Sequence, residues 1–189
     1  KFGKSEGNAL WLDINKTSSY EIYQYLINSS DEKVEEYLKV FTFLSKEEIE
    51  KVMSEHKECP EKRMAQKTLA KEIITDLHGT EEYNKALKIT EALFSGDIAS
   101  LSESELKDAL SGVQTETITE EMNIVDMLVN TKILSSKREA REFINNGSIS
   151  INGEKINTTD MLVNKEKALY NKYIVVRRGK KKYYLVIFN

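Results

Sequence analysis

The spacing of apolar residues changes once along this chain, near Gly147, and this change constrains the fold more than any other feature. Over most of the preceding sequence, apolar residues recur every three or four positions, as they do on one face of an α-helix. After Gly147, apolar and polar residues alternate, as in a half-buried β-strand. The sequence therefore predicts an all-α helical domain followed by a small α+β domain.

The helical region, residues 17–111, combines apolar stripes with signals for helix ends. The stripes are Val34, Tyr37, Leu38 and Phe41; Ala65, Leu69, Ile73 and Leu77; and Tyr83, Leu87, Thr90 and Phe94. Ser18, Ser45 and Ser102 are each followed three residues later by glutamate, the pattern of a capping box. Several helix starts in register with apolar stripes predict a helical domain with short connections.

The rest of the chain divides differently. Residues 112–123 are polar and without periodicity, which predicts a linker. Apolar residues from Ile124 begin a new helix, and Ser136 caps another over SKREAREFI. Asn152-Gly153 is a strong signal for a two-residue β-hairpin, and YIVVRRGKKKYYLVIFN reads as two strands around a glycine turn. The predicted segments are 1–16, 17–111, 112–123 and 124–189.

Composition limits the class of protein. Of the 189 residues, 31% are charged and 40% apolar, which indicates a soluble globular chain. There is no apolar run long enough to span a membrane and no signal-peptide pattern at the first residues, so we expect no membrane association. The single cysteine, Cys59, favours a reducing, cytoplasmic setting, and with only His56 nearby it predicts no metal site.

The overall net charge of −3 conceals a division along the chain. Residues 1–129 hold 15 lysines and arginines against 26 aspartates and glutamates, a balance of −11. Residues 130–189 hold 13 against 5, a balance of +8. This asymmetry predicts that the tail binds a polyanion.

Two clusters of cations in the tail form the candidate RNA-binding surface. They are Lys137, Arg138, Arg141, Arg177, Arg178, Lys180, Lys181 and Lys182. Guanidinium groups suit phosphate oxygens, and lysines add point charge. Tyr183 and Tyr184 follow, but alternation along a strand buries at least one of them, so only one is expected to be free to stack on a base. The alternative is that a charged hairpin serves solubility alone.

The stretch SKREAREFINNGSISINGEKI resembles the S-four RNA-binding domain. The shared features are a capped helix with Arg138 and Arg141, Gly147 at the turn and the Ile-Asn-Gly hairpin at 151–153. The resemblance covers about residues 124–189. It implies binding of structured RNA, mostly through the backbone and shape.

The first five residues, KFGKS, offer lysines and a hydroxyl to phosphate. These residues do not match a P-loop, because that motif needs a glycine further upstream and a preceding strand. The order of segments changes the interpretation. KFGKSEGNALWLD, TFLSKEEIE, EALFSGDIASLS, SKREARE and RRGKKKYYL together resemble the C-terminal half of bacterial-type tyrosyl-tRNA synthetases, a class I family.

By that resemblance, KFGKS is a variant of the class I KMSKS loop. Lys1 and Lys4 then match lysines that meet the departing pyrophosphate of ATP, and Ser5 matches a hydroxyl that bonds a phosphate. Donors aimed at developing charge are each worth about 10²–10³ in rate. Lys1, Lys4 and Ser5 are therefore the expected catalytic and ATP-binding residues.

The resemblance also implies partners. Tyrosine tRNA is expected to meet the helical region at its anticodon stem and the tail at its long variable arm. The family uses ATP with magnesium and dimerises through its catalytic domain. The only histidines, His56 and His78, do not form the HIGH-type signature, so by the resemblance we expect the catalytic Rossmann-like domain to be absent, with residues 1–16 its remnant. We therefore expect this chain alone to form no adenylate and to bind no cofactor. Because the family dimerises through that domain, we also expect a monomer.

Two other readings remain open at this point. One is a stand-alone S-four-type RNA-binding protein with a helical extension, which has no need of KFGKS. The other is a helical protein–protein scaffold whose tail is basic for reasons unrelated to RNA. The latter predicts that reversing the charge of Arg138, Arg141 and 180–182 leaves RNA binding unchanged.

Overall fold

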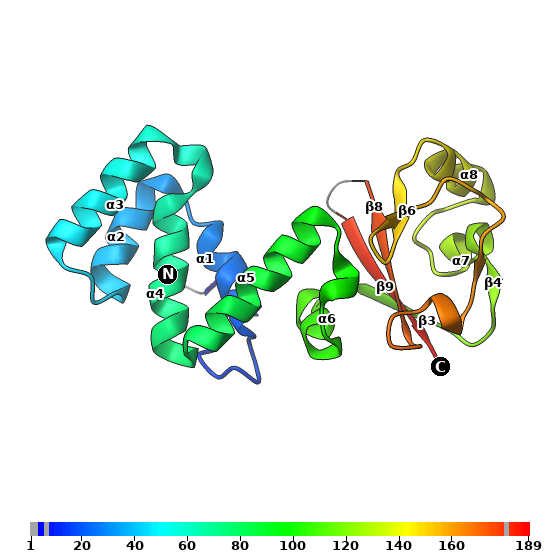
Figure 1. The fold of residues 1–189 in the computed structure, drawn as a ribbon, viewed down its shortest axis with the longest axis horizontal. Coiled ribbons are helices and arrows are strands. Elements are labelled where there is room, and N and C mark those ends of the chain that lie inside the picture. Colours follow the sequence, from blue (N-terminus) through cyan, green and yellow to red (C-terminus); the bar gives the residue numbers. More distant parts are fainter. Residues whose placement is uncertain (1–3, 6–7, 180–181) are drawn as a thin grey trace. The chain divides into compact units, whose positions relative to one another are not determined.

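The structure, a computed structural model, describes residues 4–5, 8–179 and 182–189 and divides into two compact units. The first unit, Lys1–Thr90, is built from helices, and the second, Glu91–Asn189, is a mixed sheet with helices (Figure 1). The predicted fold class, helical first and α+β second, is confirmed.

The first unit contains most of the helices. Its elements are β1 (Lys4–Ser5), β2 (Asn8–Ala9), α1 (Ser19–Ile27), α2 (Asp31–Phe41), α3 (Lys46–Glu58), η1 (Pro60–Lys62), α4 (Met64–His78) and the greater part of α5 (Thr80–Ser95). The capping boxes at Ser18 and Ser45 form as predicted, each with reciprocal bonds between serine and glutamate. These boxes satisfy backbone N–H groups that the first turn of a helix leaves without partners.

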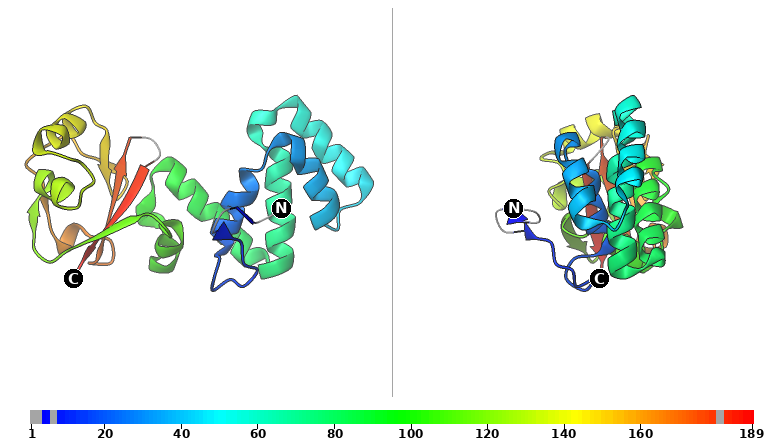
Figure 2. Two further views of the ribbon diagram at one scale, coloured as in Figure 1. Left: turned by 180° about the vertical axis from the view of Figure 1, so that it is seen from behind. Right: turned by 90° about the vertical axis from the view of Figure 1, so that its left-hand side faces the viewer.

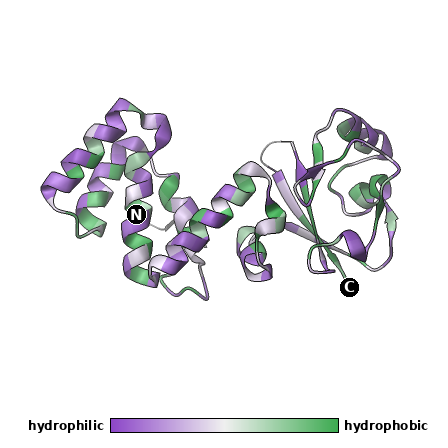
Figure 3. Cartoon of the chain, in the orientation of Figure 1, coloured by the Kyte–Doolittle hydropathy of each residue, from purple (hydrophilic) through white to green (hydrophobic). Residues whose placement is uncertain are grey.

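Helix α4 is the centre of the first unit, because α1, α2 and α3 all pack against it. Its buried face comprises Ala65, Gln66, Leu69, Ala70 and Ile74. This face drifts around the helix relative to the predicted stripe, and Leu77 at its end is 39% exposed. Figure 3 shows the mixture of apolar and polar residues that gives these helices their buried and exposed sides.

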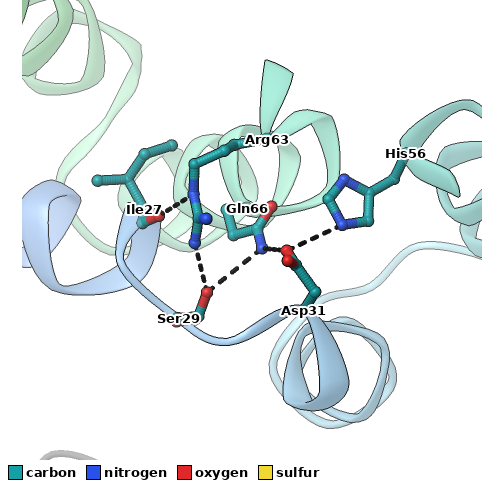
Figure 4. Close-up of polar contacts among 6 residues, drawn as sticks. All are labelled: Ile27, Ser29, Asp31, His56, Arg63 and Gln66. Carbon is teal, nitrogen blue, oxygen red and sulfur yellow. Dashed lines mark hydrogen bonds and ion pairs between the residues drawn. The ribbon is translucent and has the colours of Figure 1, made fainter. Parts of the chain in front are cut away.

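Arg63 joins the start of α4 to the end of α1 (Figure 4). Its Nε donates to the carbonyl oxygen of Ile27 at 2.7 Å, and its Nη2 donates to the carbonyl oxygen of Ser29 at 2.5 Å. Arg63 has a positive φ of 53°, a region that costs non-glycine residues energy. The two bonds to main-chain carbonyls offset that cost.

A second set of polar contacts continues from this point to α3 (Figure 4). The buried amide of Gln66 donates to Asp31 Oδ1 at 2.6 Å, and His56 Nε2 donates to the same oxygen at 3.1 Å. The bond from Gln66, helped by the charges of His56 and Arg63, holds the pKa of Asp31 below its usual 3.8. These contacts tie α2, α3 and α4 together.

The second unit is organised around a five-stranded sheet of order β3-β9-β8-β5-β6. Its elements are the last turn of α5, η2 (Ile98–Ser100), α6 (Glu103–Ala109), β3 (Gln114–Ile118), β4 (Met122–Asn123), α7 (Ile124–Asn130), α8 (Lys137–Asn145), β5 (Ile149–Ile151), β6 (Glu154–Lys155), β7 (Leu162–Val163), η3 (Lys165–Lys167), β8 (Tyr173–Arg178) and β9 (Lys182–Phe188). β3 runs parallel to β9, and the other neighbours in this sheet are antiparallel. β4 and β7 form a separate pair, and Figure 2 shows the sheet from behind.

The prediction of a linker at 112–123 is wrong, because these residues contain strand β3. Most of its side chains point to solvent and only Ile118 is buried, so the strand lacks the apolar run that usually reveals one. Its backbone pairs with β9 from Gln114, opposite Tyr184, to Ile118, opposite Phe188. The compact units also divide between Thr90 and Glu91, within α5, rather than after residue 111.

Alternation along β8 gives the sheet two different faces. Ile174 and Val176 lie in the core that includes residues of α7 and α8. Tyr173 and Val175, which point the other way, are also buried, and the hydroxyl of Tyr173 donates to Glu103 of α6 at 3.0 Å. The segment from the end of α5 through α6 therefore contacts the second face and belongs to this unit.

The predicted hairpin at Asn152-Gly153 is present between β5 and β6. Both residues have positive φ, 51° and 93°, as a tight two-residue turn requires. A Cβ added to Gly153 would lie 1.9 Å from the carbonyl oxygen of Gly96. The turn therefore packs directly on the backbone that follows α5.

Candidate nucleic-acid interface

Helix α8 presents the first predicted cation cluster. Ser136 begins the helix by accepting a bond from the Glu139 amide at 3.2 Å, and Ala140 and Ile144 are fully buried. The remaining face of its first turns carries the exposed side chains of Lys137, Arg138 and Arg141. An apolar side held against the core thus directs three cations outward, as the sequence predicts.

Arg178 of β8 is brought to the entry of α8 by an internal bond. Its Nη1 donates to the carbonyl oxygen of Ile133 at 2.7 Å, and its guanidinium lies 5.6 Å from the ring centroid of Tyr184. Hydrogen bonds from Ser135 lower the pKa of Glu139, and the charge of Arg178 adds a smaller effect in the same direction. Arg178 therefore has a structural role in addition to its predicted role as a phosphate ligand.

Lys137 has a carboxylate partner within the second unit. Its ammonium lies 2.5 Å from Asp126 Oδ1, with both side chains about half exposed. The pair lines a polar pocket together with Asn123, Arg141 and Asp160. The positive charge of Lys137 is thus partly neutralised, whereas among the described residues no hydrogen bond or ion pair engages Arg138 or Arg141.

The hairpin cations do not all lie on one face of the sheet. Arg178 and its cross-strand partner Lys182 share the face of α8, whereas Arg177 pairs with Tyr183 and points to the other face. The guanidinium nitrogens of Arg177 lie 3.6 and 3.7 Å from the position of a Cβ on Gly96. Lys180 and Lys181 lie outside the described residues.

Both candidate stacking residues have internal contacts, which corrects the prediction that one ring is free. The hydroxyl of Tyr183 donates to the carbonyl oxygen of Leu93 at 2.7 Å. Tyr184 packs against the main core beneath Arg178. Neither ring is fully exposed, because both faces of the sheet are covered at this point.

Two further cations near α8 were not singled out from the sequence. Lys132 is exposed just before the helix, with a positive φ of 55°. Lys155 lies over the turn that ends it, with its Nζ 2.9 Å from where a Cβ on Gly147 would be. Both are isolated in sequence, and only the β5–β6 hairpin brings Lys155 to this helix.

The predicted ATP-binding loop is described only in part. Lys1 lies outside the described residues, and Lys4 and Ser5 form strand β1, paired with β2. Over the described part of the chain, no cluster of three or more His, Cys, Asp or Glu side chains is arranged to hold a metal ion. The same residues include no helix with the length and apolar character needed to cross a membrane.

Comparison with known families covers both units. Residues 1–95 match the family described as tRNA synthetases class I (W and Y), and residues 105–186 match the tyrosine–tRNA ligase SYY-like C-terminal domain. A solved structure titled as a tyrosyl-tRNA synthetase C-terminal domain is 42% identical, covering 52% of this chain and 100% of that one, with a TM-score of 0.42.

Curated relatives match along the whole chain. A tyrosine–tRNA ligase of Streptococcus agalactiae is 48% identical over 190 residues, and one of Bacillus pumilus is 50% identical over 190 residues. Each alignment covers 100% of this chain and 45% of the relative, so the chain spans about half the length of these proteins. The resemblance predicted from the sequence is confirmed: this chain belongs to the class I tRNA synthetases (W and Y).

Proposed function

We propose that this chain is the tRNA-binding portion of a tyrosine–tRNA ligase, an enzyme that activates tyrosine with ATP and transfers it to tyrosine tRNA. The names of its relatives and the SYY-like C-terminal domain support this proposal. The observation that carries it is the exposed pair Arg138 and Arg141 on α8, beside the arginine that β8 brings to the same helix.

The second unit supplies the attraction for RNA. The proposed phosphate ligands are the cations of α8 and of the β8–β9 hairpin: Lys137, Arg138, Arg141, Arg177, Arg178, Lys180, Lys181 and Lys182. Their proposed target is the long variable arm. A surface that neutralises four to six phosphates gives a slope of about −3 to −5 in log affinity against log salt. The S-four type of recognition, through backbone and shape, suits an arm of double-stranded RNA.

The helical region has the proposed role of an anticodon-binding domain. The charge balance of −11 over residues 1–129, a range that contains this region and also the start of the second unit, argues against strong attraction of the helices to a phosphate backbone. We therefore assign it the positioning of the anticodon stem, with the affinity supplied by the second unit.

Lys1, Lys4 and Ser5 are the proposed phosphate ligands for ATP, acting with magnesium in the whole enzyme. That enzyme is proposed to be cytoplasmic and to dimerise through a catalytic domain. The 189-residue chain alone is expected to catalyse no tyrosine-dependent pyrophosphate exchange with ATP. Light scattering is expected to give the mass of a monomer.

Binding assays with two forms of tyrosine tRNA test the proposal. The chain is expected to bind the complete tRNA more tightly than the same tRNA without its variable arm. Replacing Arg138 and Arg141 by glutamate is expected to remove most of that difference. Equal binding of both tRNA forms by the unmodified chain would instead favour a stand-alone S-four-type RNA-binding protein.

A further inference from the structure

Lys132 has an unusual backbone conformation for a lysine. It follows α7 with a positive φ of 55°, in the left-handed region that favours glycine. Its side chain is exposed, whereas its neighbours Thr131 and Ile133 are buried. A glycine would end the helix with less strain, so the turn itself does not account for a lysine at this position.

The backbone on both sides of Lys132 is bonded to the sheet. Gln114 of β3 donates from Nε2 to the carbonyl oxygen of Thr131 at 3.3 Å. Arg178 of β8 donates from Nη1 to the carbonyl oxygen of Ile133 at 2.7 Å. Two strands thus hold the carbonyl groups before and after Lys132, and its exposed side chain extends from a backbone that is fixed in place.

Further cations lie on the same side of the sheet. Arg178 reaches the residue that follows Lys132, and the exposed Lys182 of β9 is the cross-strand partner of Arg178. The carboxylate at this place, Glu139, accepts bonds from the backbone N–H and the hydroxyl of Ser135 at 2.8 and 2.6 Å. Among the described residues, no hydrogen bond or ion pair engages Lys132. Its ammonium is therefore available to a phosphate oxygen.

We propose that Lys132 is a phosphate ligand for the bound tRNA, and that it occupies a position suited to glycine because its ammonium adds affinity. This inference rests on the proposed function. It extends the contact surface of Lys137, Arg138 and Arg141 beyond the start of α8, to the loop after α7. A lysine here weakens the fold and strengthens binding, so replacing it is expected to change stability and affinity in opposite directions.

The alternative is a structural role for the same charge. A cation just beyond the last turn of α7 can interact favourably with the negative end of the helix dipole. In that case, removing the charge lowers the stability of the fold and leaves tRNA binding unchanged. Substitutions at Lys132 in the 189-residue chain separate the two roles, with a transcript of tyrosine tRNA as the probe.

K132Q removes the charge but keeps a long side chain and the left-handed backbone. The slope of log affinity against log salt is expected to become shallower by about 0.7–0.9, which corresponds to about 5- to 8-fold weaker binding at about 0.1 M salt. Its unfolding temperature is expected to stay within about 1 °C of that of the unmodified chain. K132R keeps a cation and is expected to bind within about twofold of the unmodified chain.

K132G removes the charge and also relieves the backbone strain. It is expected to lose as much affinity as K132Q, while calorimetry is expected to show an unfolding temperature about 2–6 °C higher for the second unit. K51Q is the matched control. Lys51 is an exposed lysine of α3, in the first unit, and no hydrogen bond or ion pair engages it among the described residues. K51Q is expected to leave the salt slope unchanged.

Three results would overturn the inference: an unchanged salt slope in K132Q, an equal change of slope in K51Q, or a K132G variant no more stable than the unmodified chain. Each of them leaves the proposed function intact as long as the unmodified chain binds tyrosine tRNA more tightly than an unrelated RNA of the same size. Absence of that preference would remove the proposed function itself.

Discussion

Arg178 donates a hydrogen bond from Nη1 to the carbonyl oxygen of Ile133 at 2.7 Å, which joins the β8–β9 hairpin to the loop before α8. Arg178 therefore stabilises the fold, whereas the exposed Arg141 of α8 makes no comparable hydrogen bond among the described residues. R178A is expected to lower the free energy of unfolding by about 1–3 kcal/mol, since a partly buried carbonyl loses its donor. R141A is expected to leave unfolding unchanged and to reduce the salt slope of tRNA binding by about 0.7–0.9. Urea unfolding and a salt series check both, and equal unfolding curves for the two variants would contradict this division.

The Lys137–Asp126 pair predicts an asymmetry among the cations of α8. K137A is expected to reduce the salt slope by less than R141A does, because the charge of Lys137 is already partly neutralised. D126N releases that ammonium and is expected to tighten tRNA binding and steepen the slope, by up to about 0.9. Filter binding across a salt series measures both quantities. If K137A and R141A change the slope equally, the pair does not persist in solution.

The lowered pKa of Asp31 predicts a dependence of stability on acid. A carboxyl group whose pKa is lower in the folded than in the unfolded chain contributes stability above about pH 4, and that contribution is lost as the pH falls through the folded pKa. D31N keeps an oxygen to accept the bond from Gln66 but has no charge. It is therefore expected to be less stable than the unmodified chain at neutral pH.

The difference in the free energy of unfolding between D31N and the unmodified chain is expected to shrink as the pH falls below about 4, where Asp31 itself becomes neutral. Urea unfolding at several pH values, followed by circular dichroism and by the fluorescence of the single tryptophan, Trp11, measures it. A difference that stays constant with pH would show that the charge of Asp31 is not responsible.

Arg63 combines a left-handed backbone with two bonds to carbonyls, and two variants separate these effects. R63A loses both bonds and keeps the unfavourable φ, so we expect a loss of about 2–4 kcal/mol. R63G loses the same bonds but tolerates the φ of 53°, and is expected to be more stable than R63A by about 1 kcal/mol. If R63G were less stable than R63A, the backbone at residue 63 would have relaxed from this left-handed conformation.

Gly153 tests the packing of the hairpin turn on the segment after α5. G153A places a Cβ 1.9 Å from the Gly96 carbonyl oxygen and is expected to cost about 3–5 kcal/mol. Gly112 is the matched control, because its φ is also positive, at +75°, but nothing lies within 4 Å of an added Cβ. G112A is expected to cost about 1 kcal/mol from backbone strain alone. Thermal unfolding of both variants gives the comparison, and equal losses would contradict the close approach.

The helices could be predicted from the sequence because the residues that start a helix lie within one turn of each other. The boxes at Ser18, Ser45 and Ser102 form with both reciprocal bonds. At Ser136 only half of the box forms, because the carboxylate of Glu139 bonds Ser135 instead. A neighbouring hydroxyl one residue away was enough to change the partner.

Strand β3 and the two arginines of β8 show where sequence patterns lose information. The parallel pairing of β3 depends on β9, about 70 residues away, and its exposed side chains carry no trace of that partner. Adjacent arginines look equivalent in sequence, but the pleat sends Arg177 to one face and Arg178 to the other. Which of them is engaged depends on what covers each face, namely the segment after α5 or the loop before α8.

The place of β9 between β3 and β8 has a consequence for synthesis. The first unit has its core and all but the last turn of α5 by Thr90, so it can fold while later residues are still being translated. The sheet of the second unit is incomplete until Lys182–Phe188 have left the ribosome, because β3 pairs only with β9 in this sheet and β8 until then has only its neighbour β5. The topology thus allows the helical unit to mature first, whereas the sheet of the second unit is completed only when β9 emerges.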